Sequence, residues 1–388
     1  MKNQVPHGEC IPLTIQEMKP FLAMEIMEKA QELEAAGRHV IHLEIGEPDL
    51  ETPSCIREAC IYALRDRRSQ YTHSLGLLEL REEICKEYEK NYGVDLTPNR
   101  VLITSGTSPA MLLAFSVICH LDDEVIVSDP HYPCYPNFIR YVGARIRSVP
   151  VHEHEGFQYS LDAVKACVGE KTRAIVVNSP ANPTGTVVSA EVMEGLTQLG
   201  PFVVSDEIYH GLVYEGEAHS ALEYAEDAFV LNGFSKLYAM TGWRLGYVIA
   251  PEAFMRSLQT LQQNFFISAN SFVQWAALTA LREARQEVEA MCRIYNERRS
   301  LLLEGLRKIG FGIEVEPTGA FYILANAKRF CTDSRQFAFD ILEHAGVGTT
   351  PGIDFGQNAE GYIRFTYANS KENIEEALER IRRFLERR

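Results

Sequence analysis

Lys236 and Arg244 are two cations that stand between apolar runs of the chain. The run Phe229 to Leu231 precedes them, and Tyr247 and Val248 follow them. Burial lowers the pKa of a lysine ammonium group, and the neutral amine that results is a nucleophile for carbonyl compounds. The stretch therefore predicts a buried amine that can bond to an aldehyde or a ketone.

Three further residues with useful chemistry also follow apolar runs. Asp206 comes after the run that begins at Phe202. A carboxylate there is costly to bury unless it meets a cation, although a helix N-cap is the plain alternative. Asn182 lies in a turn with two Asn, two Pro and a Gly, which is either a rigid set of donors or an ordinary loop. Tyr132 follows an Asp-Pro pair, and its ring can stack on a flat ligand or simply pack.

A small, hydroxyl-rich turn with the sequence TSGTSP occupies residues 104–109. If a helix begins there, its free backbone N–H groups attract a phosphate or a carboxylate. An ordinary N-cap with proline in the first turn explains the pattern equally well. The sequence lacks the Walker pattern and the GxGxxG fingerprint, so a nucleoside triphosphatase or a nicotinamide enzyme is not supported.

Short apolar runs alternate with helical patterns through the middle of the chain. Strands are expected at residues 100–104, 124–127, 174–177, 202–204 and 229–231, with a helix at 110–118. Uninterrupted apolar runs are typical of buried parallel strands, and their alternation with helices indicates an α/β sheet with right-handed crossovers. Ligands bind at the carboxyl ends of such strands, which is where all the residues above are expected to lie.

Taken together, these residues converge on one ligand. The turn at 104–109 suits a phosphate, Tyr132 suits a flat ring, Asp206 suits a protonated ring nitrogen, and Lys236 suits an aldehyde. Pyridoxal 5′-phosphate has all four features, so the sequence predicts that cofactor.

The two ends of the chain carry different patterns. A helical pattern runs from Ile15 to about Gly37, and a long charged helix is expected from about Arg282 through Glu287 to Arg299. An amphipathic helix is expected from Asn373 to Arg388. We expect the ends to form a smaller domain together, with segments 1–47 and 286–388 flanking a larger cofactor-binding domain at 48–285.

Composition limits the class of protein. The chain has 388 residues, 46% hydrophobic and 23% charged, with a net charge of -15, so nucleic acid and anionic membranes are not expected partners. Its 9 cysteines are scattered without a CxxC pair, and the N-terminus lacks the apolar core of a signal peptide. A cytoplasmic protein is therefore expected. The only metal-like pattern, residues 152–155, is expected to be a solvated turn, so no metal is predicted.

Three motifs carry a resemblance to a known family: NPTG at Asn182 to Gly185, SDEIY at Ser205 to Tyr209, and MTGWRLGY after Lys236. With them the sequence resembles the class I/II aminotransferases, which are fold type I pyridoxal-phosphate enzymes, and in particular the bacterial aspartate aminotransferase branch. The resemblance extends from Ile45 to Phe365. It implies a large domain with a mostly parallel central sheet and a smaller α+β domain formed by the N- and C-terminal parts.

The resemblance implies catalytic and cofactor-binding roles. Lys236 would bond to the cofactor aldehyde and carry the proton, and Asp206 would pair with the pyridine nitrogen. Tyr209 and Asn182 would contact the phenolic oxygen of the ring, on which Tyr132 would stack. The residues implied to hold the phosphate are Gly106, Thr107, Ser235 and Arg244.

Four more residues are implied to act at the substrate or across subunits. Arg364 would clamp the substrate α-carboxylate with Gly46 beside it, and Phe321 would line the pocket. A planar guanidinium suits that task because it grips a carboxylate through two parallel hydrogen bonds. Tyr71 would reach the phosphate of the neighbouring subunit, which implies a homodimer with shared active sites.

The sequence also departs from the family pattern. Gly233 stands where some members have a serine, so one phosphate hydroxyl is expected to be missing. Ser108 stands where some aspartate-active relatives have a lysine, residues 19–24 are largely apolar, and no second arginine stands out. These features favour a neutral amino acid, such as alanine or a bulkier apolar or aromatic one, over strict aspartate specificity.

The predicted activity is a ping-pong transfer of an amino group between an α-amino acid and a 2-oxo acid. A carbon–sulfur β-lyase is an alternative, because the early cofactor chemistry is shared. A regulatory protein that binds the cofactor without catalysis is a third reading. It would need a DNA-binding extension or a damaged site, and the sequence indicates neither.

Overall fold

The computed structural model describes residues 13–388, so the first twelve residues of the predicted segment 1–47 lie outside the described part. A seven-stranded sheet in the order β2-β8-β7-β6-β5-β3-β4 forms the centre of this part. Only β8 runs antiparallel to its neighbours, and the other adjacent strands are parallel. This confirms the predicted α/β fold with a mostly parallel sheet. The strands are β2 (Val101–Thr104), β3 (Glu124–Asp129), β4 (Arg145–Pro150), β5 (Thr172–Asn178), β6 (Phe202–Asp206), β7 (Phe229–Gly233) and β8 (Gly246–Ile249).

Both faces of this sheet are buried, because successive strand residues enter different cores. In β7, Val230 packs in one cluster of buried side chains, while Phe229 and Leu231 pack in another. This explains why the strands read as uninterrupted apolar runs. One face is covered by α4 (Leu78–Tyr92), α7 (Leu161–Cys167), α8 (Ala190–Thr197) and α10 (Ser271–Glu283), with α3 (Ser54–Arg65) packed on α10. The other face is covered by α5 (Thr107–Ile118), α6 (Tyr135–Tyr141) and α9 (Glu252–Phe265).

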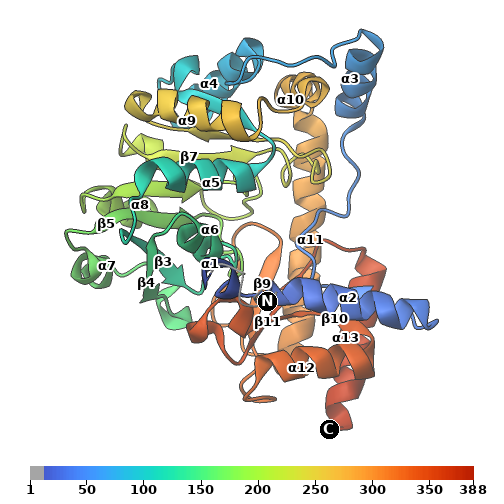
Figure 1. Cartoon of the computed structure of the whole chain (residues 1–388). Coiled ribbons are helices and arrows are strands. Elements are labelled where there is room, and N and C mark those ends of the chain that lie inside the picture. Colours follow the sequence, from blue (N-terminus) through green and yellow to red (C-terminus); the bar gives the residue numbers. More distant parts are fainter. Residues whose placement is uncertain (1–12) are drawn as a thin grey trace, which may run out of the picture.

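The ends of the chain meet in a third core. Its small antiparallel sheet has the order β11-β12-β9, and β1 pairs with β10 in parallel. In Figure 1, α11 runs from this region up to α10. Arg335 of α12 pairs with Glu25 of α2 at 3.0 Å, which ties the two ends of the chain together. The elements are α2 (Leu22–Ala35), β1 (Ile41–His42), α11 (Arg285–Ile309), β9 (Tyr322–Asn326), α12 (Ser334–Asp340), β10 (Val347–Gly348), β11 (Thr350–Pro351), β12 (Tyr362–Thr366) and α13 (Lys371–Glu386).

Several short helical turns complete the chain. They are α1 (Leu13–Gln16), η2 (Pro98–Arg100), η3 (Glu153–Glu155), η4 (Ala221–Glu223), η5 (Ile341–Ala345), η6 (Gly352–Phe355) and η7 (Gln357–Ala359).

Some sequence expectations change. The helix expected from Ile15 is interrupted after Gln16 and resumes at Leu22, because the residue before Pro20 is disfavoured in the helical region. The turn at residues 152–155 is not simply solvated. Glu153 is buried there, accepting hydrogen bonds from the backbone N–H of Glu314 at 2.9 Å and the Tyr362 hydroxyl at 3.1 Å. Among residues 13–388 no cluster of metal-ligating side chains is found.

Candidate active site

A cavity of about 230 Å³ lies at the carboxyl ends of β5 and β6, between the large sheet and the core formed by the chain ends. It brings together eight of the residues predicted from the sequence: Gly46, Thr107, Tyr132, Asn182, Asp206, Tyr209, Lys236 and Arg364. They come from segments scattered over more than three quarters of the chain. The strand-end argument predicted that Thr107, Tyr132, Asn182, Asp206 and Lys236 meet at one edge of the sheet, and the structure brings these five into one cavity. The roles assigned to them stay predictions.

Lys236 follows β7 and points its amine into this cavity. The Nζ atom donates a hydrogen bond to the carbonyl oxygen of Gly46 at 2.6 Å. Burial, together with the positive charges of Arg364 and Arg244, lowers the pKa of Lys236 to about 8, although the carboxylates of Glu47 and Asp206 oppose the shift. Near neutral pH an appreciable fraction of the amine is therefore uncharged, which is the form that attacks an aldehyde.

Asp206 ends β6 with its carboxylate buried. The Tyr135 hydroxyl donates to Oδ2 at 2.6 Å, and the backbone N–H of Ile208 donates to Oδ1 at 3.3 Å. Burial raises the pKa of Asp206 to about 6, although both hydrogen bonds favour the charged form. A carboxylate held in this way is suited to a cationic partner, and a protonated ring nitrogen would be one.

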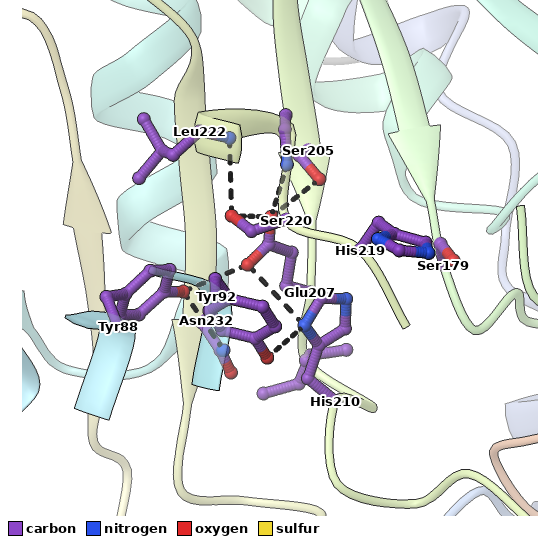
Figure 2. A network of polar contacts seen from close by, with 12 residues as sticks. Tyr88, Tyr92, Ser179, Ser205, Glu207, His210, His219, Ser220, Leu222 and Asn232 are labelled. Carbon is purple, nitrogen blue, oxygen red and sulfur yellow. Dashed lines mark hydrogen bonds and ion pairs between the residues drawn. The ribbon is translucent and has the colours of Figure 1, made fainter. Parts of the chain in front are cut away.

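Glu207, the residue after Asp206, holds the end of β6 in place. Figure 2 shows the buried Glu207 carboxylate, which is not among the residues that line the cavity, held by hydroxyl donors from three directions. They are Tyr88 of α4 at 2.9 Å, Ser205 at 3.0 Å and Ser220 at 2.8 Å. These bonds fix the backbone on which Asp206 depends, and burial raises the pKa of Glu207 to about 7.

Arg364, on β12, is buried deeply, with an exposed fraction of 1%. Its Nη1 donates to Asn182 Oδ1 at 2.9 Å, and its Nη2 donates to Thr350 Oγ1 at 3.0 Å and to the carbonyl oxygen of Glu44. The guanidinium lies between aromatic rings, 4.5 Å from the Tyr322 centroid and 5.0 Å from that of Phe355. Its Nε has no hydrogen-bond partner among the described residues. A buried cation with a donor to spare is suited to an anionic ligand.

The start of α5 provides a second place for an anion. Gly106 is the N-cap residue with φ of 103° and ψ of 170°, and no side chain caps the helix. A Cβ at Gly106 would lie 2.7 Å from Nη2 of Arg244, so glycine lets this arginine approach the turn. Thr107 lines the cavity beside them, and Ser235 is buried next to Lys236. Helix amides and a guanidinium at one place match the chemistry of a phosphate site.

The glycine at position 233 has a structural reason. A Cβ there would lie 2.9 Å from the Cα of Gly246, and a Cβ at Gly246 would lie 2.8 Å from the backbone nitrogen of Thr107. The two glycines let β8 press against the start of α5. The backbone of β8 therefore occupies the space that a serine side chain at position 233 would need.

Two predicted residues are not among those that line the cavity. Phe321 is fully buried directly behind it, with its ring centroid 5.5 Å from that of Tyr209 and 5.9 Å from the amine of Lys236, and the next residue, Tyr322, forms the wall. Whether Phe321 contacts the substrate stays a prediction. Tyr71 is 81% exposed and is not among the residues lining this cavity.

Sequence reasoning missed several residues of the site. Tyr135 and Tyr322 contact predicted residues directly, and Glu44 and Asn178 line the cavity. Tyr135 offered a usable signal, since it lies three residues after Tyr132 in an expected strand-end loop. Glu44 lies between the apolar residues Leu43 and Ile45, away from every predicted strand end, so no local pattern pointed to it.

The residues fit pyridoxal phosphate when they are compared with its groups. The cavity supplies an amine for the aldehyde, a carboxylate for the ring nitrogen and a phenol for the ring oxygen. An uncapped helix start with an arginine beside it is available for the phosphate.

Comparisons with known proteins agree with this chemistry. The family model for aminotransferase class I and II matches residues 38–381. A (5-formylfuran-3-yl)methyl phosphate transaminase of Methanocaldococcus jannaschii is 44% identical, over 94% of this chain and 96% of the relative. An aspartate/prephenate aminotransferase of Thermus thermophilus is 38% identical, over 96% and 98%.

Solved structures give the same result. The aspartate aminotransferase of Thermus thermophilus with maleate superposes with a TM-score of 0.93 at 37% identity, covering 96% of this chain and 99% of that one. A structure from Methanococcus jannaschii, described as similar in its active site to kynurenine aminotransferases, superposes with a TM-score of 0.90 at 42% identity, covering 97% and 100%. These relatives support transamination and not the carbon–sulfur lyase alternative. The chain belongs to the class I and II aminotransferases, and it is a pyridoxal-phosphate-dependent transaminase acting on an amino acid and a 2-oxo acid.

Proposed function

We propose that this transaminase takes its amino group from a neutral amino acid with an apolar side chain. The observation that carries this proposal is the lining of the cavity. Around Lys236 and Arg364 the wall is largely apolar, and these two are its only lysine or arginine among the described residues. The apolar side chains of the wall are Phe21, Ala23, Met24, Ile45, Met111 and Ile208. A second carboxylate on the substrate would therefore be buried without a cation, which is costly.

The residues of the chain act around the substrate as follows. Arg364 grips the α-carboxylate, with Gly46 beside it, and so fixes the direction of the Cα–H bond. When bound, pyridoxal phosphate supplies the electron sink that makes this C–H bond acidic. Lys236 would remove the proton from Cα as a general base and then deliver it, as a general acid, to the cofactor carbon that carried the aldehyde. Asp206 keeps the ring nitrogen protonated.

The remaining cofactor contacts are positional. Tyr209 and Asn182 would hold the ring oxygen, and Tyr132 would stack on the ring. The phosphate would be held by the start of α5, with Gly106 and Thr107, together with Ser235 and Arg244, which follow β7. Asn182 also orients Arg364 through the hydrogen bond that its Oδ1 accepts.

A panel of amino acids tests the donor. With each amino acid supplied alone, the change in the absorbance of the bound cofactor measures the first half-reaction. L-Phenylalanine or L-alanine is expected to react with a kcat/KM at least about tenfold above that of L-aspartate, since an unpaired buried carboxylate costs more than 1.4 kcal/mol. Equal or faster reaction with L-aspartate would contradict the proposal and would point to a cation that enters the cavity on binding.

We further propose that the enzyme is a homodimer in which Tyr71 reaches the phosphate of the neighbouring subunit. Tyr71 is 81% exposed in the single chain, and further exposed apolar side chains stand on α3, at the end of α9 and on the connection from α9 to α10. The Ser271 hydroxyl, at the start of α10, donates to the Arg68 carbonyl at 2.9 Å, which ties the loop before Tyr71 to this surface. Exposed apolar patches on a monomer mark interaction sites. The exposed apolar side chains are Ile61, Tyr62, Leu64, Phe265 and Ile267.

Mixing two inactive variants tests the shared site. A Tyr71→Ala subunit and a Lys236→Ala subunit are each expected to form dimers with low activity. In a hybrid dimer one site combines the intact Lys236 of one chain with the intact Tyr71 of the other. Random exchange should therefore restore roughly a quarter of the wild-type activity, because half of the dimers are hybrids with one good site. Hybrids that are verified by two affinity tags and yet remain inactive would exclude sharing.

We also propose a cytoplasmic location and a division into segments 1–47, 48–285 and 286–388. The cysteines of the described part are all free, which fits a reducing compartment. None of the helices in residues 13–388 has the length and apolar character needed to cross a membrane. The division is supported by the third core, which draws its side chains mainly from the two ends of the chain.

A further inference from the structure

Tyr322, the first residue of β9, touches three groups of the active site at once. Its hydroxyl oxygen lies 2.8 Å from that of Tyr209, and the guanidinium of Arg364 lies over its ring at 4.5 Å. A Cβ on Gly46 would stand 2.0 Å from the Tyr322 hydroxyl, so only glycine leaves room for it. The carbonyl of the same glycine accepts the hydrogen bond from Lys236. Tyr322 is thus the common neighbour of the phenol, the carboxylate clamp and the glycine whose carbonyl binds the amine.

The direction of the bond between the two tyrosines follows from hydrogen-bond chemistry. A phenol has one O–H to donate and can accept in return. If Tyr209 donates its proton to the ring oxygen of the cofactor, its own oxygen is free to accept, and Tyr322 is the donor that lies within reach. A donor that itself receives a hydrogen bond is polarised and binds its acceptor more strongly.

The charge of Arg364 acts on the same pair. Burial raises the pKa of both Tyr322 and Tyr209, and the guanidinium of Arg364 opposes the rise in each. A substrate carboxylate on Arg364 offsets the positive charge that both phenols experience. Occupation of the clamp therefore changes how strongly the two hydroxyls donate.

We propose that Tyr322 is a positioning residue of this transaminase, whose hydroxyl strengthens the hydrogen bond from Tyr209 to the cofactor oxygen and couples that bond to the occupancy of Arg364. The proposal rests on the proposed function, which places Tyr209 at the ring oxygen and the substrate carboxylate at Arg364. It assigns a role to Tyr322, which follows the Phe321 that the sequence suggested. It also explains why glycine is required at position 46.

The test is a pH titration of the visible absorbance of the bound cofactor in the holoenzyme. Tyr322→Phe keeps the ring over Arg364 and removes only the hydroxyl. Negative charge on the ring oxygen stabilises the protonated form of the chromophore, and a hydrogen-bond donor reduces this charge. A weaker donor therefore raises the pH midpoint of the titration. The midpoint of the variant is expected to lie about 0.5–1 pH unit above that of the wild type, which corresponds to the net effect of one neutral hydrogen bond.

The coupling to Arg364 is measured in the same titration with saturating 3-phenylpropanoate, a carboxylate without an amino group. Binding is expected to raise the wild-type midpoint, and the rise should fall to about half or less in Tyr322→Phe. A double-variant cycle adds the decisive comparison: in a Tyr209→Phe background, Tyr322→Phe should leave the midpoint unchanged, because its effect passes through Tyr209.

Tyr367→Phe is the matched control. Tyr367 is also a fully buried tyrosine beside this segment, with its hydroxyl 3.2 Å from the Ala320 carbonyl oxygen. Within residues 13–388 its ring packs on that of Tyr214, and it makes neither a hydrogen bond nor a ring contact with Tyr209 or Arg364. It should lower the melting temperature without moving the midpoint. If Tyr322→Phe behaves in the same way, its role is structural only and the proposal is overturned. A wild-type protein that shows no visible band after loading with pyridoxal phosphate would overturn the cofactor placement as well, so the two failures are distinguishable.

Discussion

Replacing Lys236 with alanine is expected to lower the rate of the first half-reaction by at least about 10⁴-fold. The variant loses both the amine that bonds to the cofactor aldehyde and the group that moves the proton, and general acid–base catalysis alone contributes roughly 10²- to 10⁴-fold. The remaining contacts should still retain pyridoxal phosphate without a covalent bond. Single-turnover absorbance changes with saturating amino acid measure the loss.

Borohydride provides the control for this prediction. Reduction of the wild-type holoenzyme should fix the cofactor permanently on Lys236, whereas denaturation should release it from Lys236→Ala. Lys165→Ala, which removes an exposed lysine of α7, should behave like the wild type. Labelling of any lysine other than 236 in the wild-type protein would show that the covalent partner has been misassigned.

Replacing Arg364 with alanine is expected to raise the KM for the amino acid roughly 30- to 5000-fold. Truncating one partner of a buried, hydrogen-bonded charge pair costs about 2–5 kcal/mol, and each 1.4 kcal/mol is a factor of ten. The substitution also removes the hydrogen bond that Asn182 Oδ1 accepts from Arg364, and part of the lost binding energy comes from this change. Arg364→Lys keeps a charge without the planar fork and should lie between the alanine variant and the wild type.

A substrate without a carboxylate separates binding from structural damage. For an L-phenylalanine donor, 2-phenylethylamine is the matched amine. Its slow reaction should be changed little by Arg364→Ala, because it has nothing for the guanidinium to grip. Equal losses with the amine and the amino acid, together with a lower melting temperature, would mean that Arg364 supports the fold and does not clamp the carboxylate.

The sequence reveals those parts of the site that depend on local pattern. Asp206, Asn182 and Lys236 each follow an apolar run, and parallel strands bring the ends of such runs to one edge, so their meeting could be predicted. Arg364 is different, because no local pattern relates it to Asn182, its partner 182 residues away. Only the resemblance to a family of known fold suggested it.

The errors also have physical causes. Tyr322 was overlooked beside Phe321 because both are aromatic residues of one segment that pack on Tyr209, and only the three-dimensional structure shows which of them reaches the cavity wall. The antiparallel insertion of β8 between β2 and β7 was not anticipated either, since an apolar run carries no information on strand direction. Gly233 was interpreted as the loss of a serine hydroxyl, because the sequence does not show that Gly246 packs against it.

The pairing of the chain ends has a consequence for biosynthesis. β1 depends on β10, and the Thr350 hydroxyl donates to the Glu44 carbonyl across 306 residues of chain, at 3.0 Å. At a ribosomal rate of about 5–20 residues per second, the N-terminal segment waits roughly 15–60 s for its partners to be made. During that time its apolar side chains have no native contacts with them, and the walls of the cavity are incomplete. The nascent chain is therefore inactive until translation is almost finished. During this interval it most needs chaperones to protect its exposed apolar side chains.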